Sequence, residues 1–198
     1  MAPVADMTSF VPTRRVARRW AMAALPLALC GCAAMNGCDD KAGAQNAKVK
    51  ISGKSFYLET AMDGTKRFRG LSQRTQIDEN GGMLFVFPEP RDPRGGGFVM
   101  RDCPIPIDII YLDKSARVVT TYAMVPETAR AADEGTPGEH AGDITPANQK
   151  YENRLKQYVS RYPYTFVIEL KGGKIKEIGV KEGDTVDFDH DELFKAAH

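Results

Sequence analysis

The chain is short of histidine and of net charge. Its 198 residues include only three histidines, His140, His190 and His198, all in polar or terminal stretches. A zinc site or a Ser-His-Asp triad depends on such imidazoles, so neither is predicted, and no metal or other cofactor is expected. The net charge of +1 leaves no overall basic field, so a nucleic-acid partner is not expected either.

Apolar side chains, in contrast, are plentiful enough to build a core. Hydrophobic residues make up 42% of the sequence and aromatic residues 9%, which excludes wholesale disorder. The length fits one domain with additional segments. Four arginines and one acid precede Cys32, which leaves 23 basic and 25 acidic residues, a net charge of −2, from that cysteine onward. Residues 1–31 therefore form a separate segment.

Residues 1–31 have the pattern of a signal peptide for export. Four arginines between Arg14 and Arg19 precede an apolar run over residues 21–29. A helix that spans a bilayer needs about 20 apolar residues, so this run is too short for a stable span. Met7 is an alternative start that would shorten the basic region. An ordinary cleaved signal and a buried apolar helix remain as alternatives.

The sequence Leu29-Cys30-Gly31-Cys32 resembles the lipobox of bacterial lipoproteins. In that class the cysteine thiol is acylated with diacylglycerol, and the cysteine becomes the first residue of the mature chain. Cys32 fits the lipidated position better than Cys30, because the bulky Leu29 directly precedes Cys30. Each buried CH₂ group contributes about 0.8 kcal/mol, so the acyl chains would hold the protein at the membrane.

The segment after the predicted lipidation site is a predicted linker. Residues 32–47 are rich in Ala, Gly, Asn and Asp and have no hydrophobic periodicity. Ala33 stands where an inner-membrane retention signal has Asp, so the resemblance implies an outer-membrane protein that faces the periplasm. In that oxidising compartment Cys38 and Cys103 could form a disulfide, although a structural thiol is the preferred interpretation of Cys103.

Residues 48–198 have the pattern of a mostly-β domain. Short apolar or alternating runs predict strands at 49–51, 56–59, 83–87, 98–100, 107–112, 118–125, 166–170 and 185–188. The run 83–87 lacks alternation, which predicts a central strand buried on both faces. Helices are predicted at 65–73, with Asp63 as the cap, and at 148–161. We expect a compact β-sandwich or barrel-like fold with one or two short helices.

Three segments are predicted to lack regular structure. Three prolines and three glycines over residues 88–97 exclude a strand or helix there. The polar stretch 126–146 is long for a compact domain and is interpreted as a mobile surface excursion. The acidic run 187–192 lacks the Gly and the final Glu of a calcium loop, so it is interpreted as a solvated acidic end.

Several blocks of the sequence resemble the DUF192 (UPF0127) family in their order. They are Arg69-Gly70-Leu71, the runs 82–87, 98–102 and 106–113, and the closing segments 167–170 and 179–184. The resemblance spans residues 49–188. It departs from the family pattern at Ser72, Val99 and Asp102-Cys103. It implies a small β-rich domain, often exported, whose role is unassigned, and it supplies no catalytic residues.

The candidate site lies beside the glycine-rich loop of residues 95–97. Its charged and aromatic members, which could converge on one polar cleft, are Arg69, Phe98, Arg101, Asp102 and Asp108. Charges beside apolar strands must be paired or solvated, because burial without a partner is costly. One interpretation is an arginine–carboxylate network that holds the helix on the sheet. The other is non-catalytic recognition of an envelope glycan, peptide or protein.

An alternative function is an envelope hydrolase with paired carboxylates. Two acids from Asp102, Asp108 and Asp113 would act as general acid and as base or nucleophile, which requires them to lie close together. Cys103 is not predicted to be a nucleophile, because no base is visible near it in the sequence.

Overall fold

The computed structural model describes residues 46–198 with the exception of residue 139. The predicted leader, the predicted lipidation site Cys32 and most of the predicted linker therefore lie outside the described residues. The first strand begins at Asn46, so the last two residues of the predicted linker belong to the sheet.

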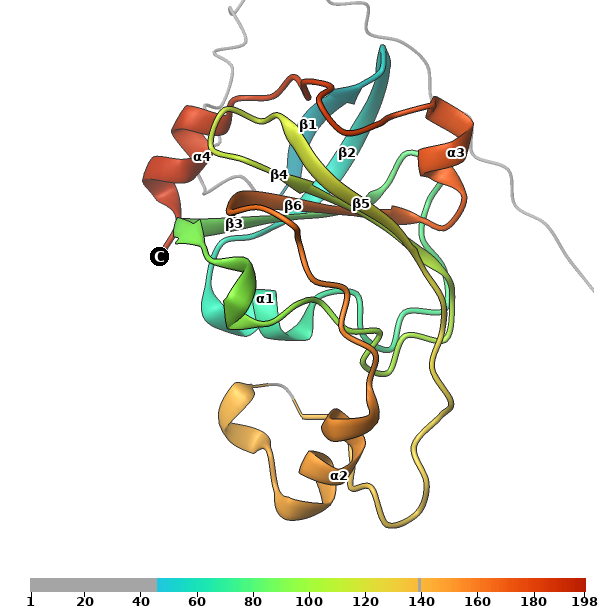
Figure 1. Cartoon of the computed structure of the whole chain (residues 1–198). Coiled ribbons are helices and arrows are strands. Elements are labelled where there is room, and N and C mark those ends of the chain that lie inside the picture. The colour runs from blue at the N-terminus through green and yellow to red at the C-terminus, as the bar shows by residue number, and fades with distance from the viewer. Residues whose placement is uncertain (1–45, 139) are drawn as a thin grey trace, which may run out of the picture. The chain divides into compact units, whose positions relative to one another are not determined.

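Six strands form one mixed sheet (Figure 1). They are β1 (Asn46–Ile51), β2 (Lys54–Ala61), β3 (Gly82–Arg91), β4 (Ile107–Leu112), β5 (Val118–Met124) and β6 (Tyr164–Lys171). The order across the sheet is β1-β2-β3-β6-β4-β5, in which only β2 and β3 are parallel neighbours. The mostly-β fold class is confirmed.

Residues 183–187 connect the two edge strands of this sheet. The main-chain N–H of Lys50 in β1 donates to Asp187 at 2.8 Å, and that of Val118 in β5 donates to Asp184 at 2.8 Å. The sheet therefore curls toward a barrel without closing into one. These contacts are isolated bridges, so the strand predicted at 185–188 does not form as a regular strand.

The predicted hairpin and central strand are both present. β1 and β2 pair antiparallel across the turn at Ser52 and Gly53. β3 contains the apolar run 83–87 and lies between β2 and β6, with Leu84 and Val86 fully buried. Contrary to prediction, β3 continues through Pro88 and Pro90 to residue 91. The regular pairing of β3 with β6 is interrupted between Val86 and Arg91, so the two prolines, which lack an N–H group, do not have to donate a hydrogen bond to β6.

The helices are short and more numerous than predicted. They are α1 (Gly64–Arg69), α2 (Pro146–Arg154), α3 (Lys174–Ile178) and α4 (His190–Ala196), with 3₁₀ turns η1 (Pro93–Gly95) and η2 (Ala141–Asp143). Asp63 caps α1 as predicted, since its carboxylate accepts the N–H of Lys66 at 2.8 Å. The acidic end is not wholly irregular, because Asp189 caps α4 in the same way.

Two predicted elements near the glycine-rich loop are wrong. α2 ends at residue 154, because residues 155–160 run extended so that Tyr158 can pair with Phe98. Phe98 forms only this isolated bridge, so no strand exists at 98–100. Gly97 allows the close approach of the two segments, since a Cβ atom there would lie 2.5 Å from the carbonyl oxygen of Tyr158.

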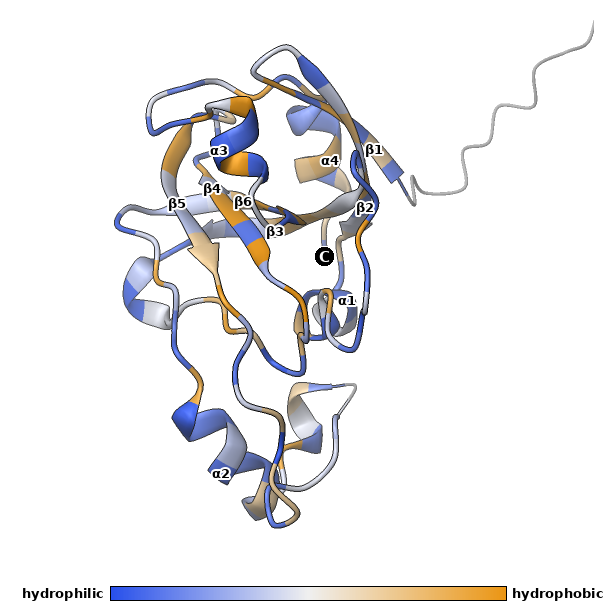
Figure 2. Ribbon diagram, turned by 90° about the vertical axis from the view of Figure 1, so that its right-hand side faces the viewer, coloured by the Kyte–Doolittle hydropathy of each residue, from blue (hydrophilic) through white to orange (hydrophobic). Residues whose placement is uncertain are grey.

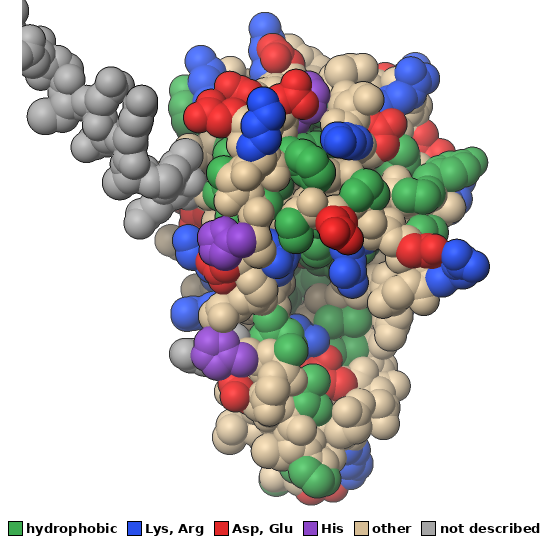
Figure 3. All heavy atoms as spheres, turned by 90° about the vertical axis from the view of Figure 1, so that its left-hand side faces the viewer, with side chains coloured by type: hydrophobic (Ala, Val, Ile, Leu, Met, Phe, Trp, Pro, Cys, Tyr) green, Lys and Arg blue, Asp and Glu red, His purple; other side chains and the backbone are tan. Residues whose placement is uncertain are grey.

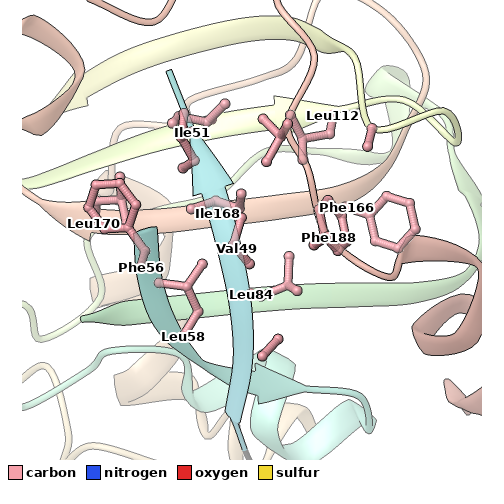
Figure 4. Packing of buried hydrophobic residues seen from close by; sticks show 14 of the residues in the cluster. Val49, Ile51, Phe56, Leu58, Leu84, Leu112, Phe166, Ile168, Leu170 and Phe188 are labelled. Atoms are coloured by element: carbon pink, nitrogen blue, oxygen red, sulfur yellow. The ribbon is translucent and has the colours of Figure 1, made fainter. Parts of the chain in front are cut away.

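The two faces of the sheet are covered differently (Figures 1 and 2). We call the first the closed face. It carries an apolar cluster, shown in Figure 4, under α3 and α4, with Val49, Phe56, Leu84, Phe166, Ile168 and Phe188 among its members. We call the second the open face. It carries Phe85, Met100, Ile109, Tyr111, Tyr158 and Val167 beneath α1 and the loops. No helix within the described residues is long and apolar enough to cross a membrane.

Candidate functional site

A pocket of about 390 Å³ lies on the open face. Its walls come from residues 64–72, which include α1 and the turn after it, from residues 95–99 of the loop, and from strands β3 and β6. Figure 3 shows this side of the molecule hollowed between the sheet and the lower part of the chain, with Lys and Arg side chains close to the hollow. The pocket is therefore assembled from segments far apart in the sequence.

Glu169 is the carboxyl group of this pocket. Its side chain projects from β6 on the open face, and the residue is only 5% exposed. Within the described residues its carboxyl group has no hydrogen-bond or ion-pair partner. Burial raises its pKa to about 8, so it is mostly protonated at neutral pH. A buried polar group without a partner is costly, which makes this carboxyl group a candidate for contact with a ligand.

Gly70 helps keep Glu169 accessible from the pocket. The backbone of Gly70 has φ +51°, a conformation that side chains rarely adopt. A Cβ atom at this position would lie 3.3 Å from the Phe85 ring and 3.9 Å from Oε2 of Glu169. The absence of a side chain at the end of α1 thus leaves space beside the buried carboxyl group.

Four arginines line the same pocket, and they differ in their partners. Arg101 donates from Nε and Nη2 to the carboxylate of Glu152 at 2.5 and 2.7 Å. Arg67 donates to three main-chain carbonyl groups. Arg69 and Arg91 are exposed and form no ion pair with any described carboxylate. The pocket therefore carries more positive than negative charge.

The structure brings three of the five predicted site residues together. Arg69, Phe98 and Arg101 line the pocket, and the Phe98 ring packs edge-on against Phe85 with centroids 4.9 Å apart. Asp102 instead binds Arg130 at 2.8 and 2.9 Å and faces a neighbouring depression. The predicted single cleft is therefore correct only in part.

Asp108 lies on the closed face, contrary to the prediction of one shared cleft. Successive side chains of a strand point to opposite faces, and the neighbours Ile107 and Ile109 belong to the open face. Asp108 is buried, and its Oδ2 accepts the main-chain N–H of Ile175 in α3 at 2.6 Å. Its role in this structure is to hold α3 on the sheet.

The carboxylates proposed for the hydrolase are thus engaged in separate contacts. Asp102 binds Arg130, Asp108 binds α3, and Asp113 accepts the N–H groups of Ser115 and Arg117 in a turn. Among the residues that the structure describes, the pocket itself is lined by one carboxyl group, that of Glu169. Two-carboxylate chemistry therefore lacks its second member at this pocket.

Residues 126–138 and 140–157, here called the lobe, are held against the open face by ion pairs. Arg130 binds Asp102, whose side chain is 11% exposed, and Glu152 binds Arg101. The Tyr151 ring lies 3.8 Å from the guanidinium of Arg130. The predicted excursion exists, but partly buried charge pairs anchor it, and Ala141 of η2 reaches the pocket wall.

Cys103 is a buried thiol in the floor region of the pocket. It is free in the structure, and Cys38, its alternative disulfide partner, lies outside the described residues. Its Sγ donates to the carbonyl of Arg101 at 3.4 Å. Burial, assisted by the charges of Glu169 and Asp102, raises the pKa of the thiol to about 12, so it stays protonated and is a poor nucleophile.

Sequence reasoning missed Glu169 as a site residue, although a signal was present. The residues on either side of it, 166–168 and 170, are all apolar, which is the pattern of a strand buried on both faces. A carboxyl group inside such a strand must be neutral, paired or in contact with a ligand. That test would have selected Glu169 without any structure.

Comparison with known families shows to which family the chain belongs. The family model DUF192, described as "Uncharacterized ACR, COG1430", matches residues 47–188. The chain belongs to the DUF192 family. This DUF192 domain contains Glu169, the four arginines and the glycine-rich loop. A search of curated proteins found no match.

Two solved structures are similar to this DUF192 chain. One, from Sinorhizobium meliloti 1021, is named a "putative transcription regulator"; it is 24% identical, with 73% of this chain and 95% of that one covered and a TM-score of 0.54. The other, a protein of unknown function from Novosphingobium aromaticivorans DSM 12444, is 25% identical, with 72% and 83% covered and a TM-score of 0.49. The first likeness supports the fold alone.

Proposed function

We propose that this DUF192 protein is a lipid-anchored protein of the periplasmic side of the outer membrane that binds a small polar ligand without catalysing its conversion. The ligand is a soluble fragment of the cell envelope that contains glycan and peptide groups. The proposal includes no nucleic-acid partner, because the chain from Cys32 onward has a net charge of −2.

One observation carries the binding role, namely the unpartnered carboxyl group of Glu169 in the pocket. A protonated carboxyl group donates one hydrogen bond and accepts others, so it suits hydroxyl and amide groups. The cost of burying Glu169 is not recovered by any contact with another described residue. A ligand that satisfies this group would offset that cost in the bound state.

The chemistry of the pocket supports binding over catalysis. General acid–base hydrolysis needs an acid and a second group that acts as base or nucleophile. Glu169 can supply the acid, but the Cys103 thiol is protonated and Tyr111 donates its hydroxyl to the carbonyl of Tyr158 at 2.5 Å. Burial also raises the pKa of Tyr111, so it is a poor nucleophile.

The anchoring role rests on the sequence of the leader. A basic segment, a short apolar run and the lipobox-like residues before Cys32 support export and lipidation. Mass spectrometry of the protein from its native membranes is expected to find a chain that begins at an acylated Cys32. An intact leader, or an unmodified thiol at position 32, would contradict the anchor and leave the binding role to its own test.

Calorimetry with a soluble muropeptide tests the binding role. Glu169→Leu is expected to abolish binding and to raise the free energy of unfolding at pH 7, because an unpaired buried carboxyl group is replaced by a methyl-bearing side chain of similar size. Glu177→Leu, at an exposed residue of α3 on the closed face, is the matched control and should bind as the wild type does.

Two results would overturn this role. The first is unchanged muropeptide binding by Glu169→Leu, or no binding by the wild type. The second is a loss of stability in both Glu169→Leu and the isosteric Glu169→Gln at pH 7, since this would make Glu169 a structural group rather than a binding group.

A further inference from the structure

We propose that the pocket selects a small organic anion with a ring-shaped body, with its acid group at Arg69 and Arg91 and a hydroxyl or amide group at Glu169. This inference rests on the proposed binding function and adds the charge and shape of the ligand. The observations that carry it are the unpaired guanidinium groups at the pocket, the single carboxyl group at its floor and the aromatic composition of its wall.

The charges of the pocket favour an anion. Within the described residues, Arg69 and Arg91 have no carboxylate partner, a feature they share with the exposed Arg117 outside the pocket. Two other exposed arginines are paired, since Arg94 binds Asp92 and Arg161 binds Glu182. A guanidinium that is free of a carboxylate can bind the acid group of a ligand through two parallel hydrogen bonds. The acid group is therefore placed at the two exposed arginines.

Arg91, the second of these arginines, lies against the aromatic wall of the pocket. The guanidinium of Arg91 lies 5.7 Å from the centre of the Phe87 ring, and that of Arg67 lies 5.5 Å from the same ring. Both arginines line the pocket together with Phe87. Arg67 is occupied by main-chain carbonyl groups, whereas Arg91 lies beside the Tyr164 side chain and has no carboxylate partner among the described residues, so Arg91 is the member of this pair that can bind an acid group.

The floor of the pocket does not oppose an anion. In the described part of the chain, Glu169 is the one acidic side chain that lines it, and burial keeps that group mostly neutral at pH 7. A neutral carboxyl group repels no acid group of the ligand, and it can hydrogen-bond to a hydroxyl or an amide. Because Glu169 is buried whereas Arg69 is exposed, the ligand would point its neutral polar end inward and its acid group toward solvent.

The wall of the pocket fits a ring between these two ends. Guanidinium groups lie over the rings of Phe68 and Phe87, and Phe85, Phe98 and Tyr164 contribute further rings to the lining. Flat apolar faces of this kind pack against aromatic rings and against the C–H faces of sugar rings. A pocket of about 390 Å³ accommodates one such ring with its substituents and is too small for a folded partner.

Two pairs of probes separate charge from shape. N-acetylmuramic acid and its carboxamide share a substituted sugar ring, and only the first carries a carboxylate; 4-hydroxybenzoate and 4-hydroxybenzamide form the aromatic pair. Calorimetry with the purified chain is expected to show that the anion binds roughly tenfold more tightly than its neutral partner in at least one pair. The pair that responds identifies a sugar acid or an aromatic acid.

The variants assign this preference to the pocket. Arg69→Gln and Arg91→Gln are each expected to weaken binding of the anion roughly tenfold and to leave the neutral probe unaffected. Arg161→Gln removes the same charge outside the pocket and should bind like the wild type. Because Arg69 is exposed and without an ion pair, the unfolding free energy of Arg69→Gln should equal that of the wild type.

Different outcomes would overturn the selection of anions and the binding function of the pocket. Equal binding of the neutral and charged probes, or unchanged anion binding by Arg69→Gln and Arg91→Gln, would overturn the selection of anions. If Glu169→Leu still abolished binding in that case, the binding function would stand. Absence of binding by all four probes at millimolar concentration would overturn the ligand class, and unchanged binding by Glu169→Leu would overturn the use of this pocket.

Discussion

The two faces of the sheet bury their apolar side chains under covers of different chemistry. On the closed face, α3 and α4 cover a cluster made of aliphatic and phenylalanine side chains. On the open face, α1, the glycine-rich loop and the lobe cover a cluster that includes tyrosines, Cys103 and the nearby carboxyl group of Glu169. The closed face is sealed by apolar contact. The open face is covered by segments that ion pairs hold in place, and this incomplete cover leaves the pocket.

This contrast assigns stability mainly to one face and ligand binding to the other. Apolar packing is non-directional and improves as voids disappear, so the interior of such a face leaves no space for a ligand. The depression of about 430 Å³ beside α4 lies at the rim of the closed face, next to Asp63 and Lys66. Charge pairs are directional and can hold a loop at a distance from the sheet. The following changes test this division, from the largest expected effect to the smallest.

Titration of Glu169 is expected to produce the largest effect. Its pKa is about 8 in the folded protein against an ordinary value of 4.5, so the unfolded chain ionises first as the pH rises. The unfolding free energy of the wild type should therefore fall between pH 4.5 and 8, by about 5 kcal/mol in all. Glu169→Gln should lack this decrease in urea unfolding measured across that range.

The other titratable groups with strongly shifted pKa values do not contribute to this pH dependence between pH 4.5 and 8. Cys103 and Tyr111 face the same region, but burial raises the pKa of each well above the range used. Glu79 and Asp92, whose pKa values are lowered to about 2 by their basic partners, contribute below pH 4.5. Parallel pH profiles of the two proteins would mean that Glu169 is ionised in the folded state at neutral pH.

Removal of a ring from each face compares the two kinds of packing. Phe166 is fully buried on the closed face and packs edge-on against Phe188, with centroids 5.3 Å apart. Phe166→Ala should lower the unfolding free energy by about 4 kcal/mol and leave ligand affinity unchanged in the folded fraction. Phe98→Ala, at a half-buried ring of the pocket wall, should cost about 2 kcal/mol and weaken binding. The reverse ranking in denaturant titrations would refute the division between faces.

The ion pair that holds the lobe against the sheet should contribute less to the free energy of unfolding than a core ring and more than a surface ion pair. Asp102 and Arg130 are 11% and 10% exposed. Asp102→Ala should lower stability by about 3 kcal/mol, because it leaves the guanidinium buried without its partner. Glu182→Ala, which breaks a pair with Arg161 in which both side chains are more than a third exposed, should cost less than about 1 kcal/mol. A double-mutant cycle with Arg130→Ala measures the coupling, and a value near zero would contradict docking by charge.

The helix caps provide the smallest and most specific comparison. Asp63 caps α1 beside the pocket, and Asp189 caps α4 on the closed face. Alanine at either position should cost about 1 kcal/mol in thermal or denaturant unfolding. Only Asp63→Ala should also alter ligand affinity, since α1 forms a wall of the pocket. Equal effects of both variants on affinity would show that α1 is not a distinct part of the binding site.

Much of the sheet could be predicted, because local pattern and burial coincide there. The hairpin of β1 and β2 and the apolar run in β3 formed as predicted. The segments around residues 98 and 185 were wrongly predicted to be strands, since each forms only one or two bridges to a distant part of the chain. A strand needs a continuous partner, and no local pattern reveals whether one is available.

The site was harder to predict, since its members come from different segments. Arg69, Phe98 and Arg101 were selected correctly as neighbours because they flank the loop that forms the wall. Asp108 was grouped with them wrongly, because its side chain points to the other face of β4. Glu169 was overlooked because its strand was interpreted only as part of the core.

The amino-acid sequence alone determines the family, the mostly-β class and the start of α1, since each depends on residue order, apolar pattern or a local cap. It also contains the leader and lipobox-like pattern on which the proposed export and lipidation at Cys32 rest. Only the tertiary structure decides that Glu169 and the exposed arginines share one pocket while Asp108 does not. The reason is that sheet pairing places β6 between β3 and β4 and sets which face each side chain points to, and both depend on contacts between residues distant in the chain.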